Sequence, residues 1–360
     1  MIVVKPLTES TLEDAETVVR SRFPPVACQI LQKEMRNPLR RICKEVGDIA
    51  YYDGKPVCFQ AFIARQMFFK TEMLFANVGG MTVLAPNAPV EALIDVRAAS
   101  VKNRIGHKMG FGNTLCKATE KMAKRHKDKF GPVSCTCWRF KPIRLLSFFR
   151  YCFAMKVLKH PIPVWADFDT LKISKFEVRD KNYIVRRLLV FDGLFADFWR
   201  RYVEKNQGLV CSRTVEELNW IFGEEVKSGR AILLGYFTDN RLEGYVVLKC
   251  GSSACRRWQI IDWIALENDK AILDRLLAAG CKFLRKHTPA MLLESIGFPM
   301  YVQDVLKRHL PFSRAAGNNF FSYGYRKPKT EGKTFAENCE AVINTEKSWF
   351  FGPYDGDMCM

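Results

Sequence analysis

Apolar and polar residues follow two different periodicities along the first 130 residues. A period of two predicts strands, whereas helical spacing, as for Leu93, Ile94 and Val101, predicts helices. The pair Asp53-Gly54 separates two apolar runs and predicts a tight hairpin turn. Ser10 and Glu13 have the spacing of a capping box at a helix start. The expected elements are a strand at 2–6, helices at 8–20 and 28–46, strands at 49–52, 57–64 and 73–84, a helix at 89–105, a strand at 109–111 and a helix at 115–126.

The second half of the chain repeats this order of elements about 180 residues later, without visible sequence identity. The expected elements are a strand at 176–179, helices at 191–203 and 215–226, a hairpin at 231–237 and 242–250, a strand at 258–266, a helix at 270–285, a strand at 289–294, a helix at 297–310 and a strand pair near 320–325. The doubled order predicts an α/β (α+β) protein. We expect an N-terminal domain at 1–168, a C-terminal domain at 169–330 and an acidic tail at 331–360.

The composition is that of a globular protein with enough apolar residues for two cores. Of 360 residues, 48% are apolar and 26% are charged, which excludes a disordered chain, a collagen and a coiled coil. The net charge of +18 is unusual and favours an anionic partner. Residues 101–160 hold 15 basic and 2 acidic residues, and the tail holds 2 basic and 6 acidic ones. We therefore expect the tail to pack back on the basic body, with a plain polar terminus as the alternative.

Neither a signal peptide nor a membrane span is visible in the sequence. The first ten residues lack an apolar core, and no apolar run reaches the roughly 18–20 residues of a spanning helix. Thirteen cysteines then fit reduced thiols better than a disulfide framework. We expect a cytoplasmic protein, at most peripheral to the inner face of the membrane.

No metal site is expected. Cys135 and Cys137 form a C-x-C pair without a second pair, and the five histidines show no i, i+4 pairing. G-x-S-x-G and P-loop motifs are also missing, which argues against a serine hydrolase and a P-loop enzyme.

Residues 138–160 interleave basic and aromatic residues, and from Ile143 onward they have the pattern of a basic amphipathic helix. One interpretation is a helix that packs between the two domains. A second is contact with an anionic membrane surface or a lipid-linked substrate. A third is RNA binding through aromatic and arginine stacking.

The doubled order of elements resembles the GCN5-related N-acetyltransferase (GNAT) fold in tandem, as in bacterial tandem-GNAT and Fem-type transferases of cell-surface assembly. The residues that carry the resemblance are Gly110-Phe111-Gly112-Asn113 before a predicted helix, Arg213 to Phe222, Ile260-Ile261-Asp262, and the tail Trp349 to Asp357. The resemblance implies two GNAT-like domains, each with a mixed twisted sheet flanked by helices. It also implies acetyl-CoA or another acyl-CoA as the cofactor.

The resemblance leaves two places for the cofactor loop in the first half. GNAT enzymes bind the pyrophosphate in a glycine-containing loop at a helix N-terminus, where backbone N–H groups and the helix dipole favour phosphate. One candidate is the segment 107–112, which brings in Gly110, Gly112 and Asn113. The other, which we favour, is the turn 86–89, which has two prolines and no glycine. It follows the strand residues that would line the cofactor, namely Thr82, Val83 and Leu84.

In the second half, the resemblance places a base on the strand before the cofactor helix and a tyrosine acid on the last helix. Those positions hold Asp262 and Tyr301. Burial in an apolar strand would raise the pKa of Asp262 toward that of a working base; the alternatives are a hydrogen-bonded strand-edge aspartate and an ordinary half-buried tyrosine. The loop there is Glu267-Asn268-Asp269, whose carboxylates would repel a pyrophosphate.

The function expected from these features is CoA-dependent N-acyl transfer to an amino group of a sugar or peptide cell-surface precursor. The expected partner is an anionic small-molecule cofactor or substrate. One alternative is a Fem-type transferase that uses aminoacyl-tRNA. The other is a catalytically degenerate binding or scaffold protein, which the missing phosphate loops favour.

Overall fold

The fold is described from a computed structural model of the chain. The residues that it describes are 1–23, 25–42, 46–69, 72–103, 109–112, 129–130, 137–157, 175–206, 208–252, 256–295, 298–315, 322–325, 349–350 and 354. The helix expected at 115–126 and the pair Cys135 and Cys137 as a unit lie outside these residues.

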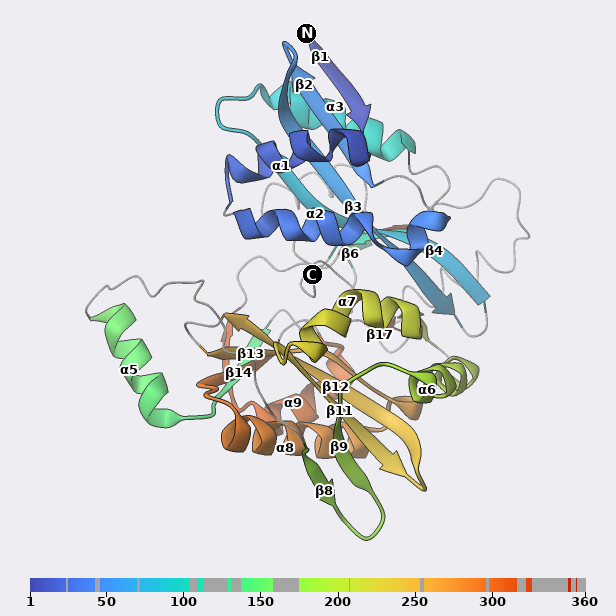
Figure 1. Cartoon of the computed structure of the whole chain (residues 1–360), viewed down its shortest axis with the longest axis vertical. Coiled ribbons are helices and arrows are strands. Elements are labelled where there is room, and N and C mark those ends of the chain that lie inside the picture. The colour runs from blue at the N-terminus through green and yellow to red at the C-terminus, as the bar shows by residue number, and fades with distance from the viewer. Residues whose placement is uncertain are drawn as a thin grey trace.

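The first sheet is mixed and contains nine strands of the described chain, in the order β1-β2-β3-β4-β5-β16-β6, with β10 paired to β3 and β17 paired to β10 (Figure 1). Only β4–β5 and β10–β17 are parallel pairs. Its strands are β1 (Ile2–Pro6), β2 (Gly47–Tyr52), β3 (Lys55–Phe69), β4 (Glu72–Leu84), β5 (Met109–Gly112), β6 (Lys129–Phe130), β10 (Leu209–Cys211), β16 (Ser322–Tyr325) and β17 (Trp349–Phe350).

Helices cover both faces of this sheet, and alternation along the strands explains why. Ile49 packs in the cluster that contains α1 (Leu12–Arg20) and α2 (Cys28–Met35). The next residue, Ala50, points to the opposite face and packs against α3 (Val90–Asn103). Strand β2 is therefore buried on both sides, as its apolar run predicts.

Two local predictions for the first half are wrong. The helix expected at 28–46 ends at Met35, and a 3-10 helix follows at Pro38–Arg41, because proline disfavours helical backbone at the residue before it. The capping box expected between Ser10 and Glu13 is replaced by one between Thr8 and Thr11, in which the Thr8 backbone N–H donates to Thr11 Oγ1 at 2.9 Å. Thr8, the residue at which the helix was expected to begin, is therefore an N-cap, that of the 3-10 turn Glu9–Thr11.

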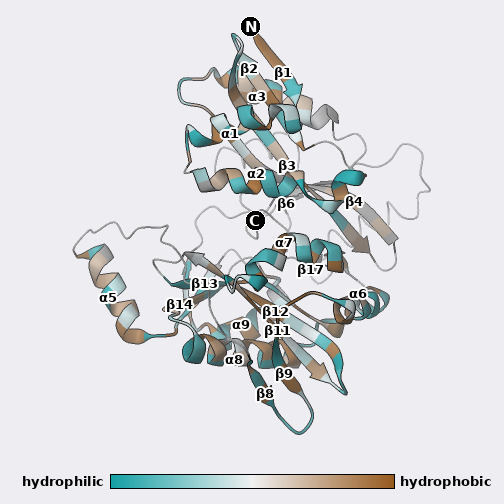
Figure 2. Cartoon of the chain, viewed as in Figure 1, coloured by the Kyte–Doolittle hydropathy of each residue, from teal (hydrophilic) through white to brown (hydrophobic). Residues whose placement is uncertain are grey.

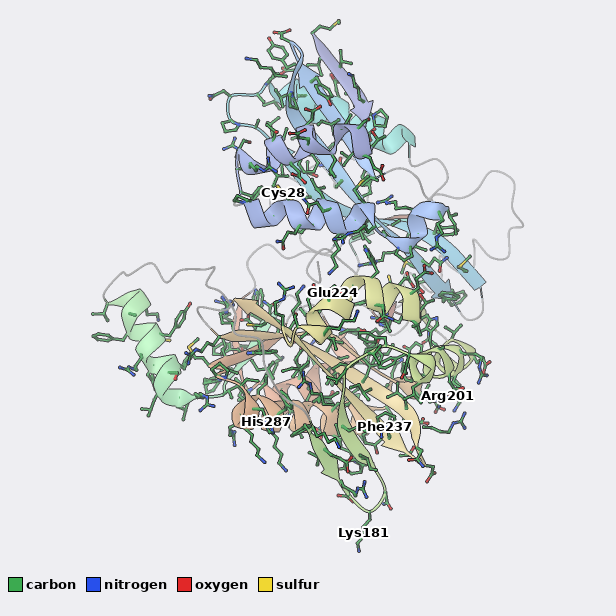
Figure 3. All side chains as sticks on the ribbon, viewed as in Figure 1. Cys28, Lys181, Arg201, Glu224, Phe237 and His287 are labelled. Carbon is green, nitrogen blue, oxygen red and sulfur yellow. The ribbon has the colours of Figure 1, made fainter. Side chains whose placement is uncertain are left out.

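The second sheet has eight strands of the described chain, in the order β15-β7-β14-β13-β12-β11-β9-β8. Its pairs are antiparallel except β13–β14. The hairpin β8–β9, which carries Lys181 at its tip (Figure 3), was not expected beyond its first strand. The strands are β7 (Cys137–Pro142), β8 (Glu177–Arg179), β9 (Ile184–Leu188), β11 (Ala231–Thr238), β12 (Arg241–Ser252), β13 (Arg257–Ala265), β14 (Leu292–Ser295) and β15 (Phe312–Ala315).

Amphipathic helices also flank the second sheet. Figure 2 shows apolar colour along the strands and mixed colour on the helices, as expected where one helix face lies on a sheet. Helix α8 buries Leu273, Leu276 and Leu277 on that face. The helices of this half are α6 (Gly193–Lys205), α7 (Val215–Lys227), α8 (Lys270–His287) and α9 (Gln303–His309), and α5 (Leu145–Lys156) follows strand β7.

The two sheets exchange strands. Strand β7, from the first half, pairs with β14, and β16, from the end of the chain, pairs with β5. Strand β10 joins the two halves by pairing with β3. A division of the chain at residue 168 stays a prediction, and these pairings show that a sequence boundary would not separate the two sheets.

Candidate functional site

Within the described residues, both sheets leave part of one strand without a second partner, and they do so at equivalent places. In the first, β4 pairs with β5 only at residues 76–78, and the rest of β4 up to Leu84 pairs with β3 alone in the described chain. In the second, β13 pairs with β14 only at residues 257–259. Where parallel neighbours diverge, the backbone N–H and C=O groups of one strand edge are left for a ligand to bind.

In the first opening, the structure places the predicted residues Thr82, Val83 and Leu84 on this edge of β4; Thr82 is exposed and Val83 is buried. Helix α3 begins six residues after Leu84. This is the arrangement in which the turn 86–89 lies between the strand and the helix.

The residues of the other arrangement lie elsewhere. Gly110 and Gly112 lie within strand β5, paired with β16 and not in a loop before a helix. Asn113 lies outside the described residues. Cofactor binding by these three residues stays a prediction, and the position of β5 does not support it.

The turn before α3 offers few backbone donors. Asn87 adopts a positive φ of 61°, the Ala88 N–H donates to the Ala85 carbonyl at 3.3 Å, and the two prolines have no N–H. A cation is nonetheless present, because Arg22 Nε donates to the Leu84 carbonyl oxygen at 3.0 Å. Sequence reasoning missed Arg22, since it follows α1 and reaches this turn only through the fold.

The equivalent loop before α8 is acidic and bound into the fold. Lys205 Nζ pairs with Glu267 at 2.6 Å, and Tyr202 donates its hydroxyl proton to Asn268 Oδ1 at 3.0 Å. Asp269 caps the helix by accepting from the Ala271 N–H at 2.7 Å. A carboxylate therefore occupies the helix N-terminus where a phosphate would bind.

Asp262 lies on β13 beyond the point where β14 diverges, and it is 1% exposed. Its carboxylate accepts from Nε and Nη2 of Arg213 at 3.0–3.2 Å and from the Tyr245 hydroxyl at 2.6 Å. Arg213 is equally buried. These contacts fit a structural ion pair better than a base that meets substrate, and the catalytic role of Asp262 stays a prediction.

Tyr301 lies near this ion pair. Burial raises the pKa of Tyr301 well above its ordinary value, Tyr202 adds to the rise, and Arg213 opposes it. The Tyr301 hydroxyl has no hydrogen-bond partner in the described chain. The fold thus brings the two predicted catalytic residues into one neighbourhood, but a tyrosine with so high a pKa is a poorly tuned acid at neutral pH.

Three further buried residues, which sequence reasoning missed, surround Arg213. Tyr354 donates its hydroxyl proton to the Ser212 carbonyl at 2.7 Å, and Arg65 Nη2 donates to the Tyr354 carbonyl at 3.1 Å. The Arg213 guanidinium lies 4.3 Å from the centre of the Tyr354 ring. Arg213 and Tyr354 lie in the segments 213–222 and 349–357, both of which carry the resemblance; Arg65, a charge inside the apolar run of β3, is a further sequence signal for this cluster.

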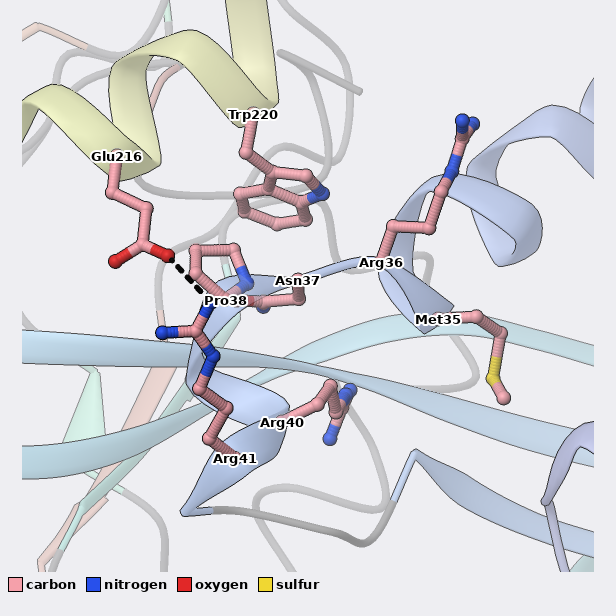
Figure 4. Close-up of a pocket in the computed structure, with 8 residues that line it drawn as sticks. All are labelled: Met35, Arg36, Asn37, Pro38, Arg40, Arg41, Glu216 and Trp220. Atoms are coloured by element: carbon pink, nitrogen blue, oxygen red, sulfur yellow. Dashed lines mark ion pairs between the residues drawn. The ribbon is translucent and has the colours of Figure 1, made fainter.

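A separate pocket of about 250 Å³ lies between the 3-10 helix at Pro38–Arg41 and α7 (Figure 4). Arg40, Arg41, Glu216 and Trp220 are among its lining residues. Arg41 pairs with Glu216 at 3.3 Å, and Arg40 pairs with the buried Glu34. Because these charged side chains already form ion pairs within the protein, the lining of the pocket indicates no particular class of ligand.

The described residues contain neither a metal-binding cluster nor a membrane-spanning helix. No three histidine, cysteine, aspartate or glutamate side chains there gather closely enough to hold a metal ion. No helix there has the length and hydropathy needed to cross a bilayer.

Solved structures that share this architecture include N-acyltransferases. GCN5-related N-acetyltransferases from Kribbella flavida and Anabaena variabilis match with TM-scores of 0.52 and 0.53 at 12% identity, and each match covers 90% of this chain and 72% of the other. An N-myristoyltransferase from Saccharomyces cerevisiae, with bound myristoyl-CoA, matches with a TM-score of 0.54 at 10% identity over 91% of this chain and 79% of the other. No protein-family model matches the sequence, and no curated protein does. The chain therefore has the GNAT fold, and the predicted mixed α+β fold class is confirmed.

Proposed function

We propose that this protein is an acyltransferase that uses an acyl-CoA to acylate an amino group. The observation that carries the proposal is the edge of β4 at residues 79–84, which pairs with β3 alone in the described part of the chain and is followed, after the turn 85–89, by the N-terminus of α3. The fold, shared with acetyl- and myristoyltransferases, supports it. The cofactor supplies the acyl group as an activated thioester.

Different groups of the chain would bind different parts of an acyl-CoA. Backbone groups of Thr82, Val83 and Leu84 suit the amides of the pantetheine arm, because an open strand edge offers alternating donors and acceptors. The first turn of α3 and the guanidinium of Arg22 suit the pyrophosphate. In this arrangement, the guanidinium of Arg22 supplies hydrogen-bond donors in place of the backbone N–H groups that the two prolines lack.

The first half is the better site of the two. Arg22, which follows α1, reaches the turn before α3, whereas the loop before α8 carries Glu267 and Asp269, and the latter already caps its helix. A phosphate at α8 would meet two carboxylates. We therefore assign acyl-CoA binding to the first opening and a structural role to the second.

The acceptor that we propose is an amine on a sugar or peptide precursor of the cell surface. The resemblance to tandem transferases of cell-surface assembly supports this choice, and the net charge of +18 suits an anionic precursor.

Isothermal titration with acetyl-CoA and with myristoyl-CoA tests the cofactor assignment. We expect binding of at least one of them, and we expect Arg22→Gln to weaken it roughly tenfold, because a charged hydrogen bond to phosphate is lost. Lys181→Gln, on the exposed tip of β8–β9, is the matched control and leaves affinity unchanged.

Three results would count against the proposal. The absence of heat with both ligands at millimolar concentration removes acyl-CoA as the cofactor, and equal affinity of Arg22→Gln and wild type removes the assigned site. Binding without any release of free CoA thiol in the presence of amine acceptors identifies a binding protein instead of an enzyme.

A further inference from the structure

Helix α5 presents a row of apolar side chains to solvent. Figure 1 shows the helix at the margin of the molecule. At 100° per residue, the row covers about one third of the helix circumference. Its members are between 56% and 82% exposed, and they are Leu145, Leu146, Phe149, Phe153 and the adjoining Val157.

This orientation is the reverse of what a helix on a globular body usually shows. Such a helix turns its apolar stripe inward. In α5, Tyr151 and Cys152 are among the half-buried residues, whereas the apolar row faces solvent. Contiguous exposed apolar surface marks a place of interaction. The structure therefore does not support the interpretation in which this apolar face packs between the two domains.

The surroundings of the row are basic. Residues 138–157 contain five basic residues and no acidic one. Arg150 and Lys156 are exposed on the helix. At its start, Arg144 Nη2 donates to the carbonyls of Arg285 and Thr288 at 3.2 and 2.9 Å, which fixes the helix to the end of α8.

The apolar surface continues from the helix to the edge of the second sheet. Phe312, on the edge strand β15, is 53% exposed, and its ring stacks on Phe140 at 5.6 Å. Phe140 in turn lies 6.2 Å from Phe148 of α5.

We propose that α5 docks the protein on an anionic lipid bilayer, with its apolar row among the upper acyl chains and its basic side chains at the headgroups. Exposed leucine and phenylalanine beside lysine and arginine, without acidic residues, have the chemistry of an interfacial helix. RNA fits less well, because Leu145, Leu146 and Val157 have no ring on which a base stacks. The contact does not depend on the proposed acyl transfer.

Sedimentation with vesicles tests this proposal without any acyl donor. We expect the full chain to co-sediment with vesicles of phosphatidylcholine and phosphatidylglycerol, but not with phosphatidylcholine alone, and to dissociate as salt screens the charges. Leu146→Glu with Phe149→Glu is expected to weaken binding at least about tenfold, because two charges would enter the apolar layer. Arg150→Gln is expected to weaken it about fivefold.

The matched control is Leu189→Glu with Val190→Glu, two exposed apolar residues on the loop between β9 and α6, which is expected to bind as wild type does. Circular dichroism of each variant checks that the fold is kept. Failure of the wild type to sediment with anionic vesicles overturns the proposal, as does unchanged binding of the Leu146→Glu, Phe149→Glu variant. Self-association that the same substitutions abolish, without vesicle binding, would identify a second copy as the occupant and also overturn it.

Discussion

At the scale of single residues, the second opening is governed by one buried ion pair. Arg213 and Asp262 are each about 1% exposed, and Tyr245 completes the acceptor set of the carboxylate. Removing charges from water is costly, and only full mutual pairing offsets the cost. This is why loss of one partner is worse than loss of both.

Asp262→Ala is expected to lower the free energy of unfolding by about 3–5 kcal/mol, because it leaves the Arg213 guanidinium buried without its carboxylate. The double variant Arg213→Met, Asp262→Leu is expected to recover a large part of this loss. Urea unfolding measures both.

The control for this prediction is Glu177→Ala in the exposed pair Glu177–Arg179, which is expected to cost less than about 1 kcal/mol. A variant Asp262→Asn that keeps wild-type stability but loses acyl transfer would identify Asp262 as a base and contradict the structural role.

At the scale of elements, helix α7 links the two halves through a cluster of charges. Glu225 pairs with Lys33 of α2 at 3.0 Å and with Lys249 of β12 at 3.5 Å. On the same contact, Trp220 donates its indole N–H to the Lys33 carbonyl at 2.7 Å. Burial alone would raise the pKa of Glu225, but Lys249 and Lys33 outweigh it and hold the pKa below its ordinary value.

Because the folded-state pKa of Glu225 is lowered, its contribution to stability is present above the ordinary glutamate pKa of about 4.3 and is lost as pH falls through the lower folded value. Glu225→Gln is expected to cost about 1–3 kcal/mol at pH 7 and to flatten the decline in stability below about pH 4.3. Denaturant unfolding at a series of pH values measures this. Glu224→Gln, at an exposed position on the same helix, is the matched control, and identical pH profiles for the two variants would refute the assignment.

At the scale of the whole molecule, one apolar core spans both sheets. Ile63 and Met67 of β3 belong to the same buried cluster as Val210 and the strands of the second sheet. Tyr354 completes this cluster from the end of the chain and touches both halves through Arg65 and Ser212. The two halves are therefore expected to unfold together.

Calorimetry is expected to show a single unfolding transition for the wild type. Tyr354→Ala is expected to lower the free energy of unfolding by about 3–5 kcal/mol, because a large aromatic side chain leaves a cavity, whereas Tyr354→Phe loses one hydrogen bond, worth about 1 kcal/mol. Tyr52→Ala, at a 43% exposed position, has little effect. Two separate transitions, of which Tyr354→Ala shifts only one, would contradict a shared core.

The sequence predicted those elements whose signals are local. Asp53-Gly54 forms the expected turn, with φ values of 49° and 79°, because both conformations are set by neighbouring atoms. Strand β9 was missed because two of its five residues are arginines. Strand β10 was missed because three residues are too few to show an alternation of apolar and polar positions. Helix α5 was expected as a basic amphipathic helix, but only the structure shows that its apolar side faces out.

By itself, the sequence determined the fold class and the excess of positive charge, since periodicity and composition are properties of short segments. Only the tertiary structure decided which strands pair and which charges meet. Arg213 and Asp262 are 49 residues apart, and Arg65 and Tyr354 are 289 apart. No local spacing encodes such contacts. They form only in the folded chain, where both partners are removed from water and each can form its hydrogen bonds or ion pair only with the other.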